Sequence, residues 1–243
     1  MYETCIFDLY GTLVDIRTEE SGTELWEKLA LFYGYYGACY QGEELHQAFL
    51  QTVQEMEAGH PKLRQDSHEA FPEIEIERVF EELYRKKGVS LPLEHAVYTG
   101  QLFRILSTEY LRLYEGTRKM LETLKKHGKK MYLLSNAQKI FTEYEMRALD
   151  IANYFDGIFI SSEHGVKKPD IRFFEKLLET YGICREQAIM IGNDGICDIE
   201  GAKEAGLAAL YVHSNLSPEE DAPNADYLLE EMDPEKMTEI LLS

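Results

Sequence analysis

The sequence has few cysteines, and they are not arranged as a cysteine-based site. The four are scattered, without the spacing of a metal-binding cluster or a redox pair: Cys5, Cys39, Cys184 and Cys197. Cys5 falls within a predicted core strand. We therefore interpret all four as buried or incidental free thiols.

Long apolar runs are also missing. No stretch approaches the roughly 20 residues that a membrane-spanning helix requires. The chain begins without the basic lead that is typical of a secretory signal. These absences predict a cytoplasmic protein that has no membrane partner.

Basic residues are scarce compared with acidic ones. The chain has 25 lysines and arginines against 44 aspartates and glutamates, which gives a formal net charge of −19. Such a charge disfavours nucleic-acid backbones and anionic membranes, so we expect neither as a partner. A small anionic substrate remains compatible with it, because the charges nearest to a site govern binding there.

What the sequence does contain is an alternation of short strands and helices. Its 243 residues, 44% of them hydrophobic, suffice for one full α/β domain and a smaller companion. Apolar and β-branched runs predict strands at residues 4–7, 130–134, 157–160, 187–191 and 208–212. Helical patterns separate the later runs, so we expect βαβ units and a largely parallel sheet.

A long segment between the first two predicted strands, from about residue 16 to about residue 95, has helical patterns only. Apolar residues recur at helical spacing in three stretches, at residues 25–33, 45–56 and 76–84. Chain breakers at residues 60–61 and 70–72 predict connections between these helices. We expect a helical insert with at least three helices.

Polar side chains follow the predicted strands at the points where the strands end. The clusters are residues 8–12, Ser135-Asn136, residues 167–170, and Asn193-Asp194 with Asp198. One cluster alone is typical of a turn or a helix cap, but the ends of parallel strands share one edge of a sheet. There an aspartate can attack an electron-poor centre, Ser and Asn can bind developing negative charge, and Lys can fix an anion.

The order and spacing of these clusters resemble the four motifs of the haloacid dehalogenase superfamily. The motifs are residues 6–15, residues 133–136, residues 168–170 with Phe174, and residues 191–194 with 198–202. The resemblance implies an α/β fold, with a Rossmann-like parallel-sheet core of residues 1–15 and 96–243. It also implies that residues 16–95 form an inserted α-helical cap, which closes over the substrate and excludes water.

The resemblance further implies roles for individual residues. Asp8 would be the covalent nucleophile. The other residues implied in catalysis are Tyr10, Ser135, Asn136 and Lys168. The residues implied in substrate binding are Gly11, Thr12, Ser135, Asn136 and Lys168.

Tyr10 departs from the phosphatases of this superfamily, which carry an aspartate there as general acid and base. A tyrosine, with a reference pKa of about 10, is a poor base at neutral pH. Tyrosine at this position resembles the metal-independent 2-haloacid dehalogenases, in which halide leaves without a proton. That branch also uses an arginine in the early cap helices and a tyrosine in the third motif. Here no arginine lies between Arg17 and Arg64, and the third motif has Phe174.

The fourth motif points toward magnesium instead. Asn193-Asp194 parallels a Glu-Asp pair with which similar phosphatases bind Mg²⁺, whereas the dehalogenases have a neutral serine. The groups that a Mg²⁺ site would combine with water are the Asp8 carboxylate, the Tyr10 carbonyl, Asn193 and Asp194. Asp198 would be a further ligand or a partner of Lys168, or alternatively the cap of a helix that begins near residue 199.

Three functions follow from these patterns. We rank first a Mg²⁺-dependent phosphatase that acts on a small phosphorylated metabolite through an aspartyl-phosphate at Asp8. The alternatives are a metal-independent 2-haloacid dehalogenase, which Tyr10 favours, and a non-catalytic binding protein with the same fold. In each case we expect a small anionic ligand and a monomer or homodimer.

Overall fold

The computed structural model describes residues 2–58, 73–219, 221 and 223–243, so the connections predicted near residues 60–61 and 70–72 lie outside it. The strands are β1 Thr4–Phe7, β2 Val14–Thr18, β3 Thr108–Leu113, β4 Lys130–Ser135, β5 Gly157–Ile160, β6 Ala188–Gly192, β7 Ala208–Val212 and β8 Tyr227–Leu229. The helices are α1 Thr23–Tyr35, α2 Gly42–Ala58, α3 Ile76–Lys86, α4 Leu93–Ser107, α5 Thr117–Lys126, α6 Lys139–Ala148, α7 Ile171–Tyr181, α8 Gly201–Glu204 and α9 Pro234–Leu242. Shorter turns are the 3₁₀ segments η1 Ala152–Tyr154, η2 Ser161–Glu163 and η3 Arg185–Gln187, and the π-helix η4 Gly195–Glu200. Among these helices none is both long and apolar enough to cross a bilayer.

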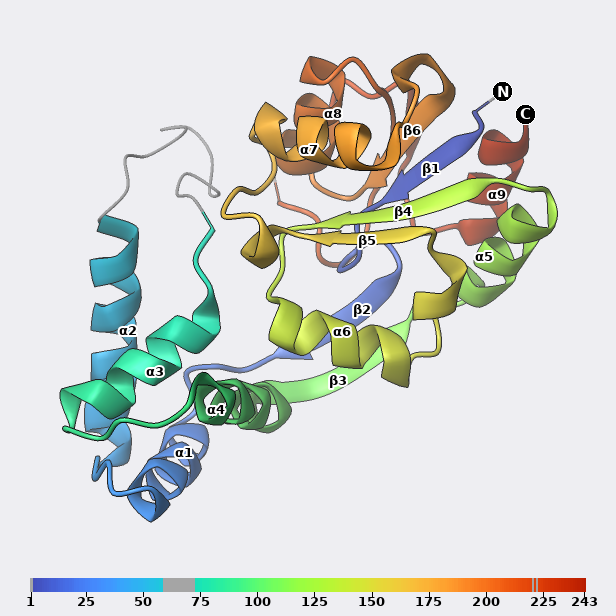
Figure 1. The fold of residues 1–243 in the computed structure, drawn as a ribbon. Helices are drawn as coiled ribbons and strands as arrows, with labels where there is room; N and C mark the ends of the chain where they lie inside the picture. Colours follow the sequence, from blue (N-terminus) through green and yellow to red (C-terminus); the bar gives the residue numbers. More distant parts are fainter. Residues whose placement is uncertain (1, 59–72, 220, 222) are drawn as a thin grey trace.

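A six-stranded parallel sheet forms the centre of the molecule, in the order β5-β4-β1-β6-β7-β8 (Figure 1). The five predicted strands are β1 and β4 to β7, which confirms the α/β fold. The strand β1 lies between β4 and β6, and both are aligned with it along its whole length. Within this sheet only β8, a three-residue strand at the edge, was not predicted.

Both faces of the sheet are covered, because apolar side chains point alternately to either side of each strand. Phe7 and Leu133 contribute to the core under α5 and α9. Their neighbours Ile6 and Leu134 contribute to the core under α7 and α8. Figure 1 shows α7 and α8 on one side of the sheet, with α5 and α9 on the other. Two separate cores therefore fix β1 from both sides.

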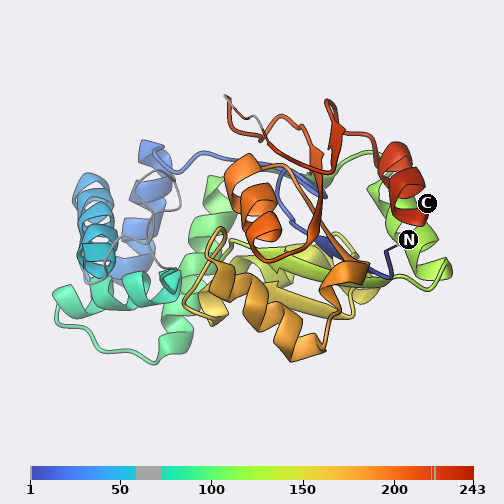
Figure 2. The same cartoon turned by 90° about the horizontal axis from the view of Figure 1, so that it is seen from above.

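The helices α1 to α4 form a unit of their own beside the sheet (Figures 1 and 2). The three predicted helices are confirmed as α1, α2 and α3. They share an aromatic core in which Trp26 lies 5.2 Å from Phe49 and 5.6 Å from Phe103, between ring centroids. Phe103 belongs to α4, so this packing extends past residue 95, where the sequence places the end of the insert.

Two further strands, β2 and β3, make an antiparallel ribbon that was not predicted. The strand β2 runs to Thr18 and so enters the segment that we expected to be purely helical. Its partner lies about 95 residues later in the chain, so no local pattern reveals the pairing. The Asp15 side chain accepts hydrogen bonds from Arg112 (2.6 Å), Asn215 (3.0 Å) and Tyr110 (3.2 Å). The bonds from Arg112 and Tyr110 hold the two strands of the ribbon together, and the bond from Asn215, which follows β7, fastens the ribbon to the sheet domain.

Candidate active site

Asp8 directly follows the central strand, at the edge where the parallel strands end. Its backbone N–H donates to the carbonyl of Ile191 in β6 (2.9 Å), and its side chain is buried. Its Oδ1 accepts from Lys168 Nζ at 2.8 Å and from the Ser135 hydroxyl at 3.4 Å. Its Oδ2 has a longer contact, 3.5 Å, with the hydroxyl of Thr12. Strands β1 and β4 and the loop after β5 thus meet at this carboxylate, as predicted.

The loop after Asp8 packs tightly beneath Asn193. Gly11 has φ of +87°, and a Cβ there would lie 2.4 Å from the Asn193 amide nitrogen, so only glycine fits. The Thr12 hydroxyl donates to Asn193 Oδ1 at 3.3 Å. Gly11 and Thr12 therefore shape the loop after Asp8 and seat Asn193 next to it.

Lys168 is the buried cation of the site. Its Nζ donates to Asp8 Oδ1 and, at 2.6 Å, to Asp198 Oδ1, and the residue is 1% exposed. Burial alone lowers the pKa of Lys168, but the carboxylates of Asp198 and Asp8 outweigh it and hold that pKa above its ordinary value. The ammonium is therefore charged at neutral pH.

Asn136 holds Lys168 in place. Its Nδ2 donates to the Lys168 carbonyl at 2.9 Å, and its Oδ1 accepts from the Lys168 N–H at 2.7 Å. Both polar groups of the amide are thus bonded to one residue's backbone. These two bonds orient the lysine, and the binding of negative charge on a substrate by this side chain stays a prediction.

Asp198 supports Lys168 rather than a helix end. Its Oδ2 accepts from the N–H groups of Asn193 (3.0 Å) and Asp194 (3.1 Å), while its Oδ1 bonds the lysine. Burial raises the pKa of Asp198 to about 7, against the opposing effect of the Lys168 charge. The helix cap is Asp194, whose Oδ1 accepts from the first N–H groups of η4, so the cap alternative for Asp198 is wrong. Its contacts match the other alternative, a partner of Lys168.

Tyr10 points its hydroxyl away from the nucleophile. The hydroxyl donates to Glu145 Oε2 at 2.5 Å and lies 3.2 Å from Thr142 Oγ1, both on α6. Burial and the Glu145 charge raise the pKa of Tyr10 further above its ordinary value. A hydroxyl held in this way is a poor base, in line with the argument from the sequence, and the implied part of Tyr10 in catalysis stays a prediction.

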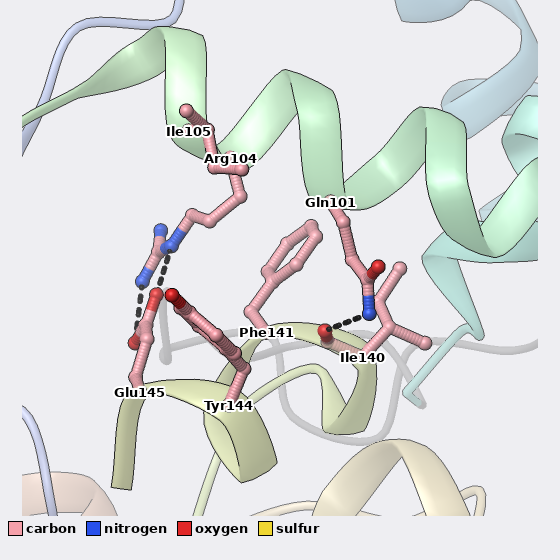
Figure 3. Close-up of a pocket in the computed structure, with 7 residues that line it drawn as sticks. All are labelled: Gln101, Arg104, Ile105, Ile140, Phe141, Tyr144 and Glu145. Atoms are coloured by element: carbon pink, nitrogen blue, oxygen red, sulfur yellow. Dashed lines mark hydrogen bonds and ion pairs between the residues drawn. The ribbon is translucent and has the colours of Figure 1, made fainter. Parts of the chain in front are cut away.

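Glu145 and Arg104 were missed by the sequence analysis. Arg104 of α4 donates to Glu145 Oε1 at 2.6 Å (Figure 3). The other oxygen of Glu145 accepts the Tyr10 hydroxyl. A signal for Glu145 existed: it follows Phe141 and Thr142 by helical spacing, so it falls on the buried face of α6. A charged residue on such a face requires a partner.

The described residues around Asp8 enclose a cavity of about 170 Å³. Those that carry oxygen donors suited to a hard cation are Asp8, Tyr10, Asn193, Asp194 and Asp198. In the described part of the chain, no three Asp, Glu, His or Cys side chains converge as a ready-made metal cage. Mg²⁺ commonly uses only one or two carboxylates, with water and substrate phosphate as the other ligands. The donor set therefore fits Mg²⁺ by its chemistry.

Comparison with known proteins assigns the chain to a family. A family model described as haloacid dehalogenase-like hydrolase matches residues 2–206. The chain therefore belongs to this family of hydrolases, which confirms the resemblance drawn from the four motifs.

Several relatives by sequence are phosphatases. A glyceraldehyde 3-phosphate phosphatase from Methanothermobacter thermautotrophicus is 36% identical over 110 residues, which are 45% of this chain and 49% of that protein. A phosphoserine phosphatase from Thermus thermophilus is 28% identical over 149 residues, 59% of this chain and 60% of that protein. The chain thus spans about half the length of these curated relatives.

Similarity of structure does not separate phosphatases from dehalogenases. The crystal structure of a 2-haloacid dehalogenase from Pseudomonas syringae matches with a TM-score of 0.64 over 100% of both chains, at 20% identity. At that identity the likeness shows the fold alone. The choice between the two chemistries has to come from the site.

Proposed function

We propose that this protein is a Mg²⁺-dependent phosphatase that acts on a small phosphorylated metabolite with Asp8 as nucleophile. The charge of the cavity supports this most directly. Three carboxylates, those of Asp8, Asp194 and Asp198, share it with the single ammonium of Lys168. Such a cavity repels an anion unless a cation is bound, and Mg²⁺ would cancel its excess negative charge so that a phosphate can enter. The similar phosphatases support the same choice.

In this proposal the two oxygens of Asp8 have different tasks. Lys168 and Ser135 hold Oδ1, which orients the carboxylate, while Oδ2 has only its long contact with Thr12. Oδ2 attacks phosphorus, and the bond from phosphorus to the leaving oxygen breaks as the new bond forms. Water then attacks phosphorus and releases Asp8. Mg²⁺, held by Asp8, Asp194 and neighbouring oxygens, would neutralise charge on the phosphoryl group.

The position of Tyr10 limits which substrates react well. Because its hydroxyl donates to Glu145, the leaving oxygen takes its proton from water. Loss of a general acid costs roughly 10²–10⁴ in rate when the leaving group is strongly basic. We therefore propose a preference for substrates whose leaving oxygen is weakly basic, such as acyl or aryl phosphates.

We further propose that the helical unit is the cap that covers the substrate. It joins the sheet domain through the β2–β3 ribbon and through α4, so its far boundary lies at Ser107, the end of α4, and not at residue 95. A cap hinged there would close over bound substrate and exclude bulk water from the site.

A panel of phosphate esters tests this function. Phosphate release would be followed with Mg²⁺ or with EDTA, using 4-nitrophenyl phosphate, acetyl phosphate and glycerol phosphates. We expect release that needs Mg²⁺ and favours the first two compounds. Asp8→Asn should abolish it, whereas Asp226→Asn, which alters a surface pair with Lys203, should leave it unchanged. No release from any compound would reject the phosphatase.

One observation favours a second function, the metal-independent 2-haloacid dehalogenase. Tyr10 matches that branch, but Phe174 is fully buried in the sheet core and offers no hydroxyl. Arg104, on the cap helix α4, is already bonded to Glu145. Halide release from 2-chloropropionate in the presence of EDTA would establish this function in place of the first.

A further inference from the structure

A chain of three side chains connects the helical unit to the nucleophile loop. Arg104 extends from α4 to α6, where its Nε donates to Glu145 Oε1 at 2.6 Å and its Nη2 lies 3.4 Å from Oε2 (Figure 3). Glu145 Oε2 accepts the Tyr10 hydroxyl at 2.5 Å. Tyr10 stands two residues after Asp8. One carboxylate therefore links α4 to the catalytic loop.

The link is buried, which makes it more than a surface ion pair. The Glu145 side chain is 6% exposed and that of Arg104 16% exposed. The guanidinium also lies over two rings, 5.6 Å from the centroid of Tyr10 and 5.2 Å from that of Phe141. Removing one partner from such a group leaves an uncompensated buried charge, so the three side chains hold one arrangement.

We propose that Glu145 and Arg104 are positioning residues, which fix Asp8 through the side chain of Tyr10. The proposal rests on the proposed function for its kinetic consequence. The tyrosine at this position, which cannot act as an acid, instead holds the loop between Asp8 and Val14 against α6. Arg104 connects this hold to α4, so the placement of the helical unit and that of the nucleophile depend on the same carboxylate.

The closeness of α4 and α6 agrees with this dependence. A Cβ on Gly100 of α4 would lie 2.5 Å from the Ile140 side chain of α6, so the two helices approach closely there. Gln101 donates to the Ile140 carbonyl at 3.4 Å. The contact between α4 and α6 is therefore fixed at two places, at Gly100 and Gln101 and, one turn later, at Arg104. A shift of α4 along α6 moves Arg104, which holds the carboxylate that accepts the Tyr10 hydroxyl.

A matched pair of sites in the same protein allows a controlled test. Tyr154 donates to Glu122 at 3.2 Å, and Lys125 lies over its ring at 5.7 Å, so tyrosine, carboxylate and cation recur away from Asp8. Tyr10→Phe and Glu145→Gln would be compared with Tyr154→Phe and Glu122→Gln. The readouts are kcat and KM for 4-nitrophenyl phosphate, and the amide hydrogen exchange of residues 8–14.

We expect the two site variants to lower kcat by roughly 10- to 100-fold with KM within about twofold, because small misplacements of a nucleophile are costly. Exchange of residues 8–14 should become at least about tenfold faster. The double variant of Tyr10 and Glu145 should resemble the worse single one, since both act through one contact. The Tyr154 and Glu122 variants should leave kcat and this exchange unchanged.

Two outcomes overturn the proposal. Variants that lose thermal stability while kcat and exchange of residues 8–14 stay at wild-type values would show that the link only joins helices. Additive effects of Tyr10→Phe and Glu145→Gln would show independent actions. If the wild type releases no phosphate, the proposed function fails, and the exchange of residues 8–14 alone decides whether Glu145 positions the loop.

Discussion

The buried ammonium of Lys168 bonds two carboxylates, so its removal leaves both without a counter-charge. We expect Lys168→Met to lower the free energy of unfolding by about 3–5 kcal/mol at neutral pH and to abolish turnover. Chemical denaturation would measure the first effect. Lys119→Met removes an exposed pair with Glu235 and should leave stability nearly unchanged.

The cost of Lys168→Met should also depend on pH. Burial raises the pKa of Asp198 to about 7 with the lysine present, and without that cation the pKa rises further. A raised carboxyl pKa in the folded state means that the folded variant prefers the protonated acid, so its stability falls as pH increases. The loss should therefore be small near about pH 5 and large near about pH 8. An equal loss at both values would contradict this electrostatic account.

The sequence predicted which residues gather at the site but not how each is oriented. Asp8, Ser135 and Lys168 follow strands whose ends must share an edge, so their meeting was predictable. Side-chain direction depends on neighbours from distant elements. Asn136 faces the Lys168 backbone and Tyr10 faces Glu145, and neither direction is written in local spacing.

At the scale of elements, the β2–β3 ribbon depends on the buried carboxylate of Asp15. Burial tends to raise its pKa, but hydrogen bonds from Asn215, Arg112 and Tyr110 prevail and hold the pKa below its usual value. A lowered pKa stabilises the fold above the ordinary carboxyl range, and this stabilisation disappears as pH falls through the folded-state pKa.

We therefore expect Asp15→Asn to lower the free energy of unfolding at neutral pH by about 1.5–3 kcal/mol, as for hydrogen bonds to a charged group. The difference from wild type should shrink in acid, below about pH 4. Urea unfolding of both proteins at the two pH values measures it. A constant difference would mean that packing, rather than charge, accounts for the loss.

Elements with a strong local pattern were predicted, and those that depend on distant partners were not. The amphipathic helices α1 to α3 and the strands of the central sheet carry their own periodicity. The helix α4 contains Gly100 in its middle, which weakens a helical pattern, yet the contact with Ile140 requires a small residue there. Strands β2 and β3 exist only as a pair of segments far apart in the chain.

The whole molecule carries a formal charge of −19, and this should make its stability depend on salt. Added KCl screens the repulsion between the acidic side chains and should stabilise the fold. A gain of about 1 kcal/mol in the free energy of unfolding raises Tm by about 2–4 °C for a chain of this size. Mg²⁺ at equal ionic strength should add to this if it binds at Asp194, by about 2.7 kcal/mol at one hundred times its Kd.

Calorimetry of the wild type and of Asp194→Asn in KCl and in MgCl₂ separates the two effects. The amide can still accept the N–H groups of η4, so the helix cap is retained. The variant should respond to KCl as the wild type does and lose the additional stabilisation by Mg²⁺. An equal Mg²⁺ response in both proteins would place the cation elsewhere on the surface.

The central position of β1 also has a consequence for the protein during its synthesis. Asp8 leaves the ribosome well before the two strands that flank β1, because β4 and β6 lie much later in the chain. Lys168 and Asp198, which complete its surroundings, belong to the last third of the chain. A nascent chain that has not yet reached residue 188 cannot form the site. Asp8 therefore lacks its partners until residue 198 has been made, and the proposed activity cannot begin before then.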